Sequence, residues 1–474
     1  MFVIAPLVRS EPALASDFVL TSRTIGQGYA ERRYGPGGAS ELLTRRRLTQ
    51  YLNLSMFNIE PERWRGKDGD RNLVSLEIGM RFDSDFGTFL TGRPSGLDTI
   101  RELTQSQFDV LYAYLLARDV AGHLDVQLGR QLHYDLVDFY SFDGADLWLR
   151  PGPFVSLQAF GGTEVRGELP VSAPLYELDG TSPGSRDQAT RPAQSSAWRP
   201  MVGAAVALDR SSPVNARVAY RKVFSQTRDQ LPGEPGSGVN HETLSFTGDA
   251  RWRDRLFLSV GARYNLLVAA WDDQQAAARL RVGVRHLLSV EYSFLAPTFD
   301  GDSIWNIFGA GSYRDWRAAY DLQVTPAWRA HVRGFVRQFV DASGVPTVLS
   351  DAAPGGRRAS GASAGFDVRG PRGRARADGY VETGYGGWKV GGDASGRWIL
   401  RPNLFDLEGR VTLSAWRTDN VPQPRDAMMV GGALGCIYHL GHKMRVHFLG
   451  EDNTGTYYRA QVRGLAVLEM DVTL

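Results

Sequence analysis

The C-terminal segment of the chain alternates strictly between apolar and polar side chains. Between residues 458 and 474, one parity carries mainly Ala, Val, Leu and Met, whereas the other carries mainly Arg, Gln, Glu and Asp. A period of two residues is typical of a β-strand with one apolar and one polar face. Strands in soluble sheets usually have about five or six residues. This segment therefore predicts a long strand with a charged face.

The same alternation recurs throughout the chain. It is clearest in residues 74–82, 124–129, 256–266, 374–382 and 405–414, where charged or polar side chains take every second position. The core of a soluble protein would not accept so many charges. A closed barrel accepts them, because its apolar parity faces lipid and its polar parity faces a water-filled lumen. We therefore predict an all-β fold, a single transmembrane antiparallel up-and-down β-barrel.

Average composition hides this pattern. The 474 residues are 43% hydrophobic and carry a net charge of +2, which excludes a disordered chain and gives no basic footprint for nucleic acid. No apolar run approaches the roughly 18 residues of a transmembrane helix. The single cysteine, Cys436, excludes an intramolecular disulfide.

The connections between the candidate strands give an independent test. We count about 22 strands, with tight links after even-numbered strands and longer links after most odd-numbered ones. The tight links include Asp119-Val120, Pro151, 210–212, Arg253-Asp254, Gly370-Pro371, 401–403 and 440–442. The long links include 85–104, 164–198, 225–240 and 341–359, and residues 60–70 form a longer link on the short side. Short turns at one end and long loops at the other are typical of a Gram-negative outer-membrane barrel, with both termini in the periplasm.

The N-terminus is consistent with export. Residues 2–8 are apolar, and Ala13 to Ser16 have the small side chains of a signal-peptide cleavage site, although a basic start is missing. We expect residues 1–16 to be a residual signal or processing segment and residues 17–474 to form the barrel.

Five tryptophans fall near predicted strand ends. They are Trp148, Trp252, Trp328, Trp398 and Trp416. Outer-membrane barrels place aromatic girdles at the headgroup level on both sides of the membrane. We predict such a girdle here, the alternative being ordinary aromatic residues within strands.

Catalytic and metal-binding patterns are weak. Residues 361–365 match the G-x-S-x-G pattern around Ser363, but an alternating strand follows it, where a nucleophile elbow needs a helix. His439 and His442 flank a turn without a third ligand, and the Asp-rich residues 300–302 lack the Glu of an EF-hand. We therefore expect no enzyme, no cofactor and no metal.

The lumen is the remaining candidate site. By parity alone, its lining and cargo-contacting residues are Glu77, Arg81, Asp125, Gln127, Arg263, Arg279, Arg281, Arg333, Arg337, Arg374, Arg376, Asp378, Glu382, Glu408, Arg410, Arg459 and Arg463. A guanidinium group binds carboxylates and sulfates in a fork, so this set favours anionic cargo. The alternative is that arginines and acids pair across strands and only satisfy one another.

Two short motifs resemble those of alginate-export-type outer-membrane porins. They are Gly129-Arg130-Gln131 and Phe142-Asp143-Gly144, and residues 298–305 and 452–455 look like features of related barrels. The resemblance implies a barrel of 18 strands that exports an exopolysaccharide. It also implies contact with outer-membrane lipid and lipopolysaccharide, with periplasmic polysaccharide export and synthesis proteins, and with the barrel-assembly machinery. The count of about 22 strands and the terminal Leu474, where an aromatic residue is usual, depart from that family.

Three functions therefore compete at this stage. The first is a porin that exports an anionic polysaccharide, and the second is a general diffusion porin for small anionic or neutral solutes. The third is an outer-membrane hydrolase that uses Ser363 or an Asp–His pair. The first two differ in the lumen. A secretion pore needs a wide, continuous passage, whereas a diffusion porin usually folds one loop inward as a constriction.

Overall fold

The computed structural model describes residues 17–34, 40–59, 73–85, 106–165, 199–208, 213–224, 238–296, 312–340, 358–419, 425–456 and 460–473. Residues 1–16, in which we expected a processing segment, lie outside the described residues, as does Arg459. Strands make up most of the described chain, and no helix there is long and apolar enough to cross a membrane.

The described residues form 22 strands. They are β1 (Asp17–Tyr34), β2 (Ser40–Phe57), β3 (Val74–Asp85), β4 (Ser106–Val120), β5 (Leu124–Tyr134), β6 (Phe139–Leu149), β7 (Val155–Val165), β8 (Pro200–Leu208), β9 (Val214–Phe224), β10 (Val239–Trp252), β11 (Leu256–Asn265), β12 (Ala270–Val282), β13 (His286–Leu295), β14 (Ser312–Thr325), β15 (Trp328–Val340), β16 (Arg358–Gly370), β17 (Gly373–Gly384), β18 (Gly387–Arg401), β19 (Phe405–Thr418), β20 (Arg425–His439), β21 (Met444–Gly455) and β22 (Ala460–Thr473).

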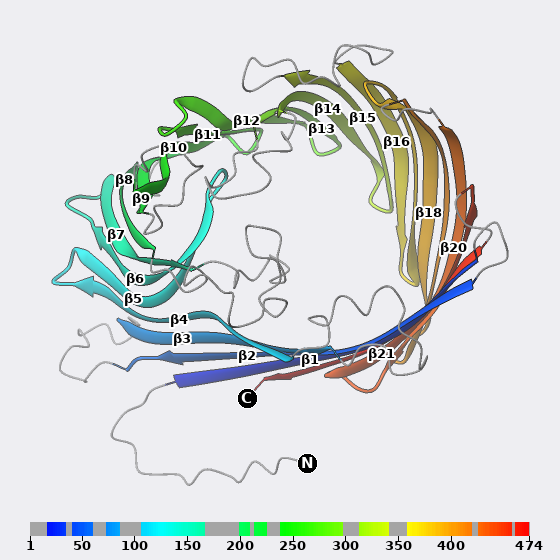
Figure 1. The fold of residues 1–474 in the computed structure, drawn as a ribbon, viewed down its shortest axis with the longest axis horizontal. Helices are drawn as coiled ribbons and strands as arrows, with labels where there is room; N and C mark the ends of the chain where they lie inside the picture. Colours follow the sequence, from blue (N-terminus) through cyan, green and yellow to red (C-terminus); the bar gives the residue numbers. More distant parts are fainter. Residues whose placement is uncertain are drawn as a thin grey trace, which may run out of the picture.

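Each strand pairs antiparallel with its neighbours in sequence, and β1 pairs with β22 to close the ring. Figure 1 shows the ring of strands, with the first and last strands side by side. Closure leaves no unpaired sheet edge, which is the condition for a sheet to cross a membrane. The predicted closed barrel and the count of about 22 strands are confirmed, and the 18 strands implied by the family resemblance are wrong.

The predicted asymmetry of the connections is also present. Links after even strands are short, down to Pro326-Ala327 between β14 and β15 and Pro371-Arg372 between β16 and β17, and the exception is the link between β2 and β3. The longest link joins β7 to β8 at residues 166–199. Strand β1 begins, and β22 ends, at the short-turn end, which is periplasmic in such barrels.

The outer face of the wall is apolar. Exposed side chains on it include Leu128, Val206, Val332, Val411 and Val462, each on the parity that the sequence assigned to lipid. A closed barrel with this exterior is an integral protein of an outer membrane.

The predicted tryptophan girdle is only partly correct. Trp252, Trp328 and Trp398 are exposed on the outer face, all at the short-turn ends of their strands. Trp148 instead shares the inner parity and donates a hydrogen bond from Nε1 to Asp146 at 3.1 Å. Trp416 also lies on the inner parity, with Ser414. Position near a strand end does not decide the face, because one residue of offset reverses it.

Candidate functional site: the lumen and its inward hairpin

The hairpin of β5 and β6 leaves the wall and curves into the enclosed space (Figure 1). Its tip, residues 135–138, reaches the inner face of β11. There Gly261 leaves room for it, because a Cβ atom at Gly261 would lie 2.7 Å from Cγ1 of Val137 and 2.8 Å from Cδ2 of Leu136. The tip therefore spans from β5 to a strand six places further round the ring. The hairpin thus occupies part of the space that the barrel encloses.

Glycines form the corner at which this hairpin turns inward. Gly129 on β5 lies opposite Gly144 on β6, which in turn lies opposite Gly162 on β7. Gly129 has a φ of 124°, and a Cβ atom there would lie 2.1 Å from the carbonyl oxygen of Ala113. A Cβ at Gly144 would lie 2.0 Å from the carbonyl oxygen of Gly161. Only glycine allows the backbones to approach this closely in a sharply bent sheet.

An apolar cluster holds the folded hairpin against the wall. Tyr140 and Phe142 of β6 pack with Phe160 of β7, Met201 of β8 and Val223 of β9, and all five side chains are buried. The three aromatic rings stack or tilt against one another with centroids 5.8–6.2 Å apart. Burial of each such side chain contributes about 1.5–3 kcal/mol. The polar parity of β6 thus becomes a hydrophobic core in this region.

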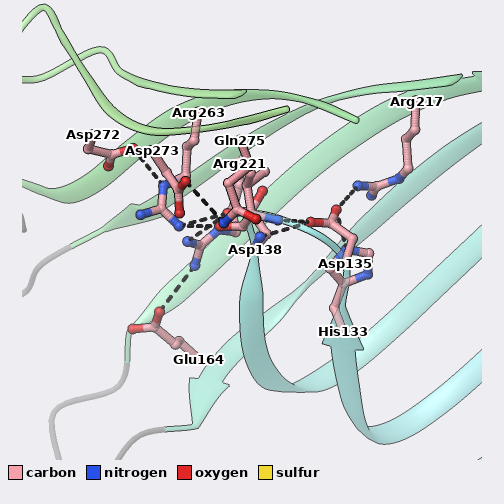
Figure 2. A network of polar contacts seen from close by, with 11 residues as sticks. His133, Asp135, Asp138, Glu164, Arg217, Arg221, Arg263, Asp272, Asp273 and Gln275 are labelled. Atoms are coloured by element: carbon pink, nitrogen blue, oxygen red, sulfur yellow. Dashed lines mark hydrogen bonds and ion pairs between the residues drawn. The ribbon is translucent and has the colours of Figure 1, made fainter. Parts of the chain in front are cut away.

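An ion-pair network fixes the hairpin tip to the opposite strands (Figure 2). Asp138, whose side chain is 4% exposed, lies between Arg221 of β9, at 4.0 Å, and Arg263 of β11, at 3.5 Å. Arg263 also donates from Nε to Asp272 at 2.8 Å. Buried charges are tolerated only when paired and hydrogen-bonded in this way.

A β-bulge brings two acids of β12 to the same side. The register between β11 and β12 shifts after Arg263, so that Arg263 lies opposite Asp273 while Tyr264 lies opposite Trp271. Asp272 is the extra residue, and it points toward Arg263 with Asp273 beside it (Figure 2). The bulge thereby breaks the strict alternation at the point where the tip docks.

Asp135 anchors the other side of the tip. It accepts hydrogen bonds from Arg217 of β9 at 3.0 Å and from the backbone amides of Val137 and Asp138 at 3.0 and 2.8 Å, and it contacts His133 at 3.2 Å. Burial alone would raise the pKa of Asp135, but the hydrogen bonds from His133 and the two amides outweigh it and hold that pKa below its usual value. The carboxylate is therefore kept ionised.

Among the described residues, the hairpin does not reach the inner face of the wall from β16 to β22. A groove of about 750 Å³ lies on the inner face of these strands. Six arginines from β16 to β19 and from β22 line it together with Asp367, Glu408 and Glu451, and they are Arg369, Arg374, Arg376, Arg397, Arg410 and Arg463. On the hairpin, Leu132, Tyr134 and Phe139 are exposed on the parity that does not pack against the wall. The described inner surface thus combines a charged wall with an apolar hairpin face.

The structure places the predicted lining residues that it describes on the inner parity. Many are engaged within the wall: Arg81 with Asp109, Asp125 with Arg150, Arg263 with Asp272, Arg279 with Glu291, Arg337 with Asp315, Arg376 with Asp378, Arg463 with Glu451, Glu77 with Tyr114 and Glu408 with His447. The carbonyl oxygen of Gln127 accepts from Gln131, and Glu382 lies opposite Lys389. Cross-strand pairing within the wall therefore accounts for most of the acids and many of the arginines.

The remaining arginines are exposed and unpaired. Among the described residues, Arg281, Arg333, Arg374 and Arg410 form no ion pair and no side-chain hydrogen bond, and all four are exposed. Arg374 lies directly opposite Arg397, whose own guanidinium is engaged by Asp406. These four side chains, together with the exposed Arg369 that lines the groove, are cations of the described residues available to a solute.

The two short motifs form three consecutive rungs of the inward hairpin. Gly129 pairs with Gly144, Arg130 with Asp143, and Gln131 with Phe142. Arg130 binds Asp143 through two hydrogen bonds of 2.7 and 2.8 Å, on the parity opposite to that of Gln131 and Phe142, and donates a third to the carbonyl of Val110 at 2.9 Å. The motif therefore builds the corner of the hairpin.

The sequence did not predict this hairpin. Its residues alternate like those of any other pair of strands up to the tip, and the glycine spacing reveals the corner only once the register is known. Three features of the sequence indicate the hairpin in retrospect. They are the glycine in each motif, the two aspartates Asp135 and Asp138 at the tip, and the aromatic residues at inner positions of β6.

The hydrolase reading lacks its geometry. Ser363 lies in the middle of β16 opposite Arg333 and Tyr380, and in the described part of the chain it has no hydrogen bond to a histidine. The ring of His331 instead contacts Asp378 at 2.7 Å, and that of His439 contacts Asp406 at 3.2 Å. No group of three potential metal ligands is found among the described residues.

No protein-family model and no curated relative matches the chain. Among solved structures, it is similar to the outer membrane protein opdK from Pseudomonas aeruginosa, at 12% identity and a TM-score of 0.41 with 96% of this chain and 99% of that chain covered. It is also similar to a BenF-like porin from Pseudomonas fluorescens Pf-5, at 9% identity and a TM-score of 0.45 with 98% and 100% covered. A third is OccAB4 of Acinetobacter baumannii, at 6% and 0.43, again with 98% and 100% covered. Similarity at this level assigns no substrate, and the resemblance to alginate-export-type porins gains no support.

Proposed function

We propose that this protein is a diffusion porin for small anionic solutes. The observation that carries the proposal is the inward hairpin of β5 and β6, which occupies part of the lumen and narrows it opposite the arginine-lined groove. A constriction of this kind is typical of a diffusion pore. Export of a polysaccharide fits this lumen less well, because a polymer needs a wide, continuous passage.

The charge of the open wall supports the choice of anions. Arg333, Arg374 and Arg410 are exposed on the inner parity without an ion-pair partner. The acids of the groove are mostly engaged, since Glu451 binds Arg463 and Glu408 binds His447. Fixed like charges along a pore set its selectivity, and guanidinium groups favour carboxylate and phosphate partners.

Planar-bilayer recording of the purified protein across a salt gradient tests the proposal. We expect open channels whose reversal potential shows preference for chloride over potassium. The variant Arg333→Glu/Arg374→Glu/Arg410→Glu should shift that preference toward cations. A matched variant, Arg372→Glu/Arg401→Glu/Lys443→Glu, changes the same number of unpaired cations at the short turns and should shift it much less.

A wild-type channel that prefers potassium would overturn the anionic assignment. A barrel without conductance would overturn the porin itself. Liposome swelling with a small carboxylate and a neutral sugar of similar size separates the two solute classes, because only the charged solute should lose permeability in the triple lumen variant.

A further inference from the structure

The outer face of the barrel carries a hollow that lies on the other side of the wall from the lumen and that the pore function does not use. It has a volume of about 490 Å³ and extends over β9 to β14, which lie side by side in Figure 1. Its lining side chains are almost entirely apolar, and they include Val214, Ala216, Phe246, Gly248, Ala250, Leu258, Val260, Ala276, Ala278, Val290, Tyr292 and Trp316.

Small residues in register form the floor of this hollow. Gly248 of β10 lies opposite Ala216 of β9 on one side and Val260 of β11 on the other, and Val260 lies opposite Ala276 of β12. The next outward rung toward the short turns places Leu258 opposite Ala278. Gly and Ala also take outward positions on β17 and β18, where Ala377 lies opposite Ala394, but the hollow described here lies over β9 to β14. The row of Gly and Ala therefore makes a depression that a chain of methylene groups can fill.

The hollow opens toward two basic turns at the short-turn end. The pair of Ala250 and Leu258 lies two residues along the strands from the pair of Trp252 and Leu256, which is the last pair before the β10–β11 turn. In that turn Arg253 and Asp254 both adopt positive φ, and Arg255 follows them.

Three arginines of these turns are exposed and unpaired. Arg253 and Arg255 belong to the β10–β11 turn and Arg285 to the β12–β13 turn, and among the described residues none forms an ion pair or a side-chain hydrogen bond. The one acid of the two turns, Asp254, is already engaged by Arg251. Trp252 is 67% exposed on the outer face beside them, with the Arg253 guanidinium 6.0 Å from its ring centre. These cations therefore gather at the short-turn end of the strands that carry the hollow, with Arg253 beside the outward Trp252, and they are called the cationic rim below.

We propose that this hollow and its rim form a binding site for an anionic phospholipid of the periplasmic leaflet. An acyl chain lies over the Gly and Ala floor, and Arg253, Arg255 and Arg285 bind the phosphate. Guanidinium groups form charge-assisted, often bidentate hydrogen bonds to phosphate. Trp252 has the amphipathic ring that membrane interfaces favour. The surface is continuous with the lipid-facing band, so lipid is the partner that reaches it first.

Charge decides which lipid the site prefers. A zwitterionic lipid of the same chain length fills the hollow equally well but offers the rim no net charge. Cationic side chains near a membrane surface attract anionic lipids, and several such cations act together. The arginines therefore give the site its preference for anionic headgroups, whereas the hollow binds the acyl chain of either lipid. This inference does not depend on the proposed pore function.

Native mass spectrometry of the purified full chain in a neutral detergent tests the proposal. The probes are dioleoylphosphatidylglycerol, which is anionic, and dioleoylphosphatidylcholine, which has the same chains. We expect the wild-type protein to retain the anionic lipid with at least about tenfold preference. Arg253→Gln/Arg255→Gln/Arg285→Gln should abolish the preference while leaving the weaker binding of phosphatidylcholine unchanged.

Two further variants separate a built site from general attraction. Ala276→Trp fills the hollow and should lower retention of both lipids. Arg372→Gln/Arg401→Gln/Lys443→Gln removes the same number of exposed, unpaired cations at short turns outside the hollow and should leave the preference intact. Equal loss of preference in the two triple variants would overturn the site, as would a wild-type protein that retains both lipids equally. If the wild-type protein appears as a dimer in these spectra and Ala276→Trp converts it to a monomer, the hollow is a protein interface instead.

Discussion

Two regions of the same barrel use one alternating pattern in different ways. From β16 to β22 the inner parity lines a groove, most of the arginines in it are exposed, and the described neighbouring strands are joined by the ladder and by ion pairs. From β5 to β12 the folded hairpin covers part of the inner parity, and the positions beneath it include buried apolar side chains and buried charges. The comparison shows that alternation builds the wall, whereas glycine corners and buried partners decide where the wall folds in.

The largest expected effect comes from breaking the glycine corner. Gly129→Val adds a Cβ atom that would lie 2.1 Å from the Ala113 carbonyl oxygen, on a backbone with a φ of 124°. We expect a loss of about 3 kcal/mol or more in the free energy of unfolding. Urea unfolding in detergent micelles, followed by gel mobility, measures it. Gly464→Ala is the control, because its Cβ meets no atom within 4 Å, and it should change stability by less than about 0.5 kcal/mol.

Releasing the tip should have the next largest effect. Arg263→Met leaves Asp138 and Asp272 buried without their main partner, which costs about 3–5 kcal/mol when one member of a buried pair is lost. The hairpin should detach from β11, so single-channel conductance should rise and become noisier. Unchanged conductance with unchanged stability would show that the network does not hold the constriction.

The matched substitution in the open region should have a small effect on stability. Arg463→Met removes the ion pair with Glu451, but both side chains are partly exposed, and such pairs contribute about 0–1 kcal/mol. Stability should therefore fall far less than in Arg263→Met, measured by the same unfolding assay. A comparable loss in both variants would contradict the distinction between the two regions.

The smallest expected effect is a pH dependence confined to the hairpin. The pKa of Asp135 is below its usual value in the folded state, so this carboxylate contributes stability above the unfolded value of about 4 and loses it as pH falls through the folded pKa. Conductance should therefore rise as the pH is lowered below about 4. Asp135→Asn removes this titration, and its conductance should depend less on pH over that range. A pH response identical to that of the wild-type protein would assign the effect to other groups.

The sequence by itself determined the barrel. Alternation at period two fixes the parity of every strand, so the outer apolar face and the inner placement of residues such as Arg374 and Arg410 could be predicted without coordinates. The lengths of the connections fixed the short-turn end and a number of strands near 22. Trp148 and Trp416 show the limit of this reasoning, because position near a strand end does not specify a face.

Only the tertiary structure decided what the lumen contains. The motif around Arg130 and Asp143 suggested a family, yet its glycines act by facing one another across three strands, which depends on register between segments far apart in sequence. In the same way, Asp138 meets Arg263 only because the chain folds back across the ring over a separation that no local pattern encodes. Local periodicity determines the wall because it needs only neighbouring residues, whereas the constriction depends on packing between strands that are distant in the chain.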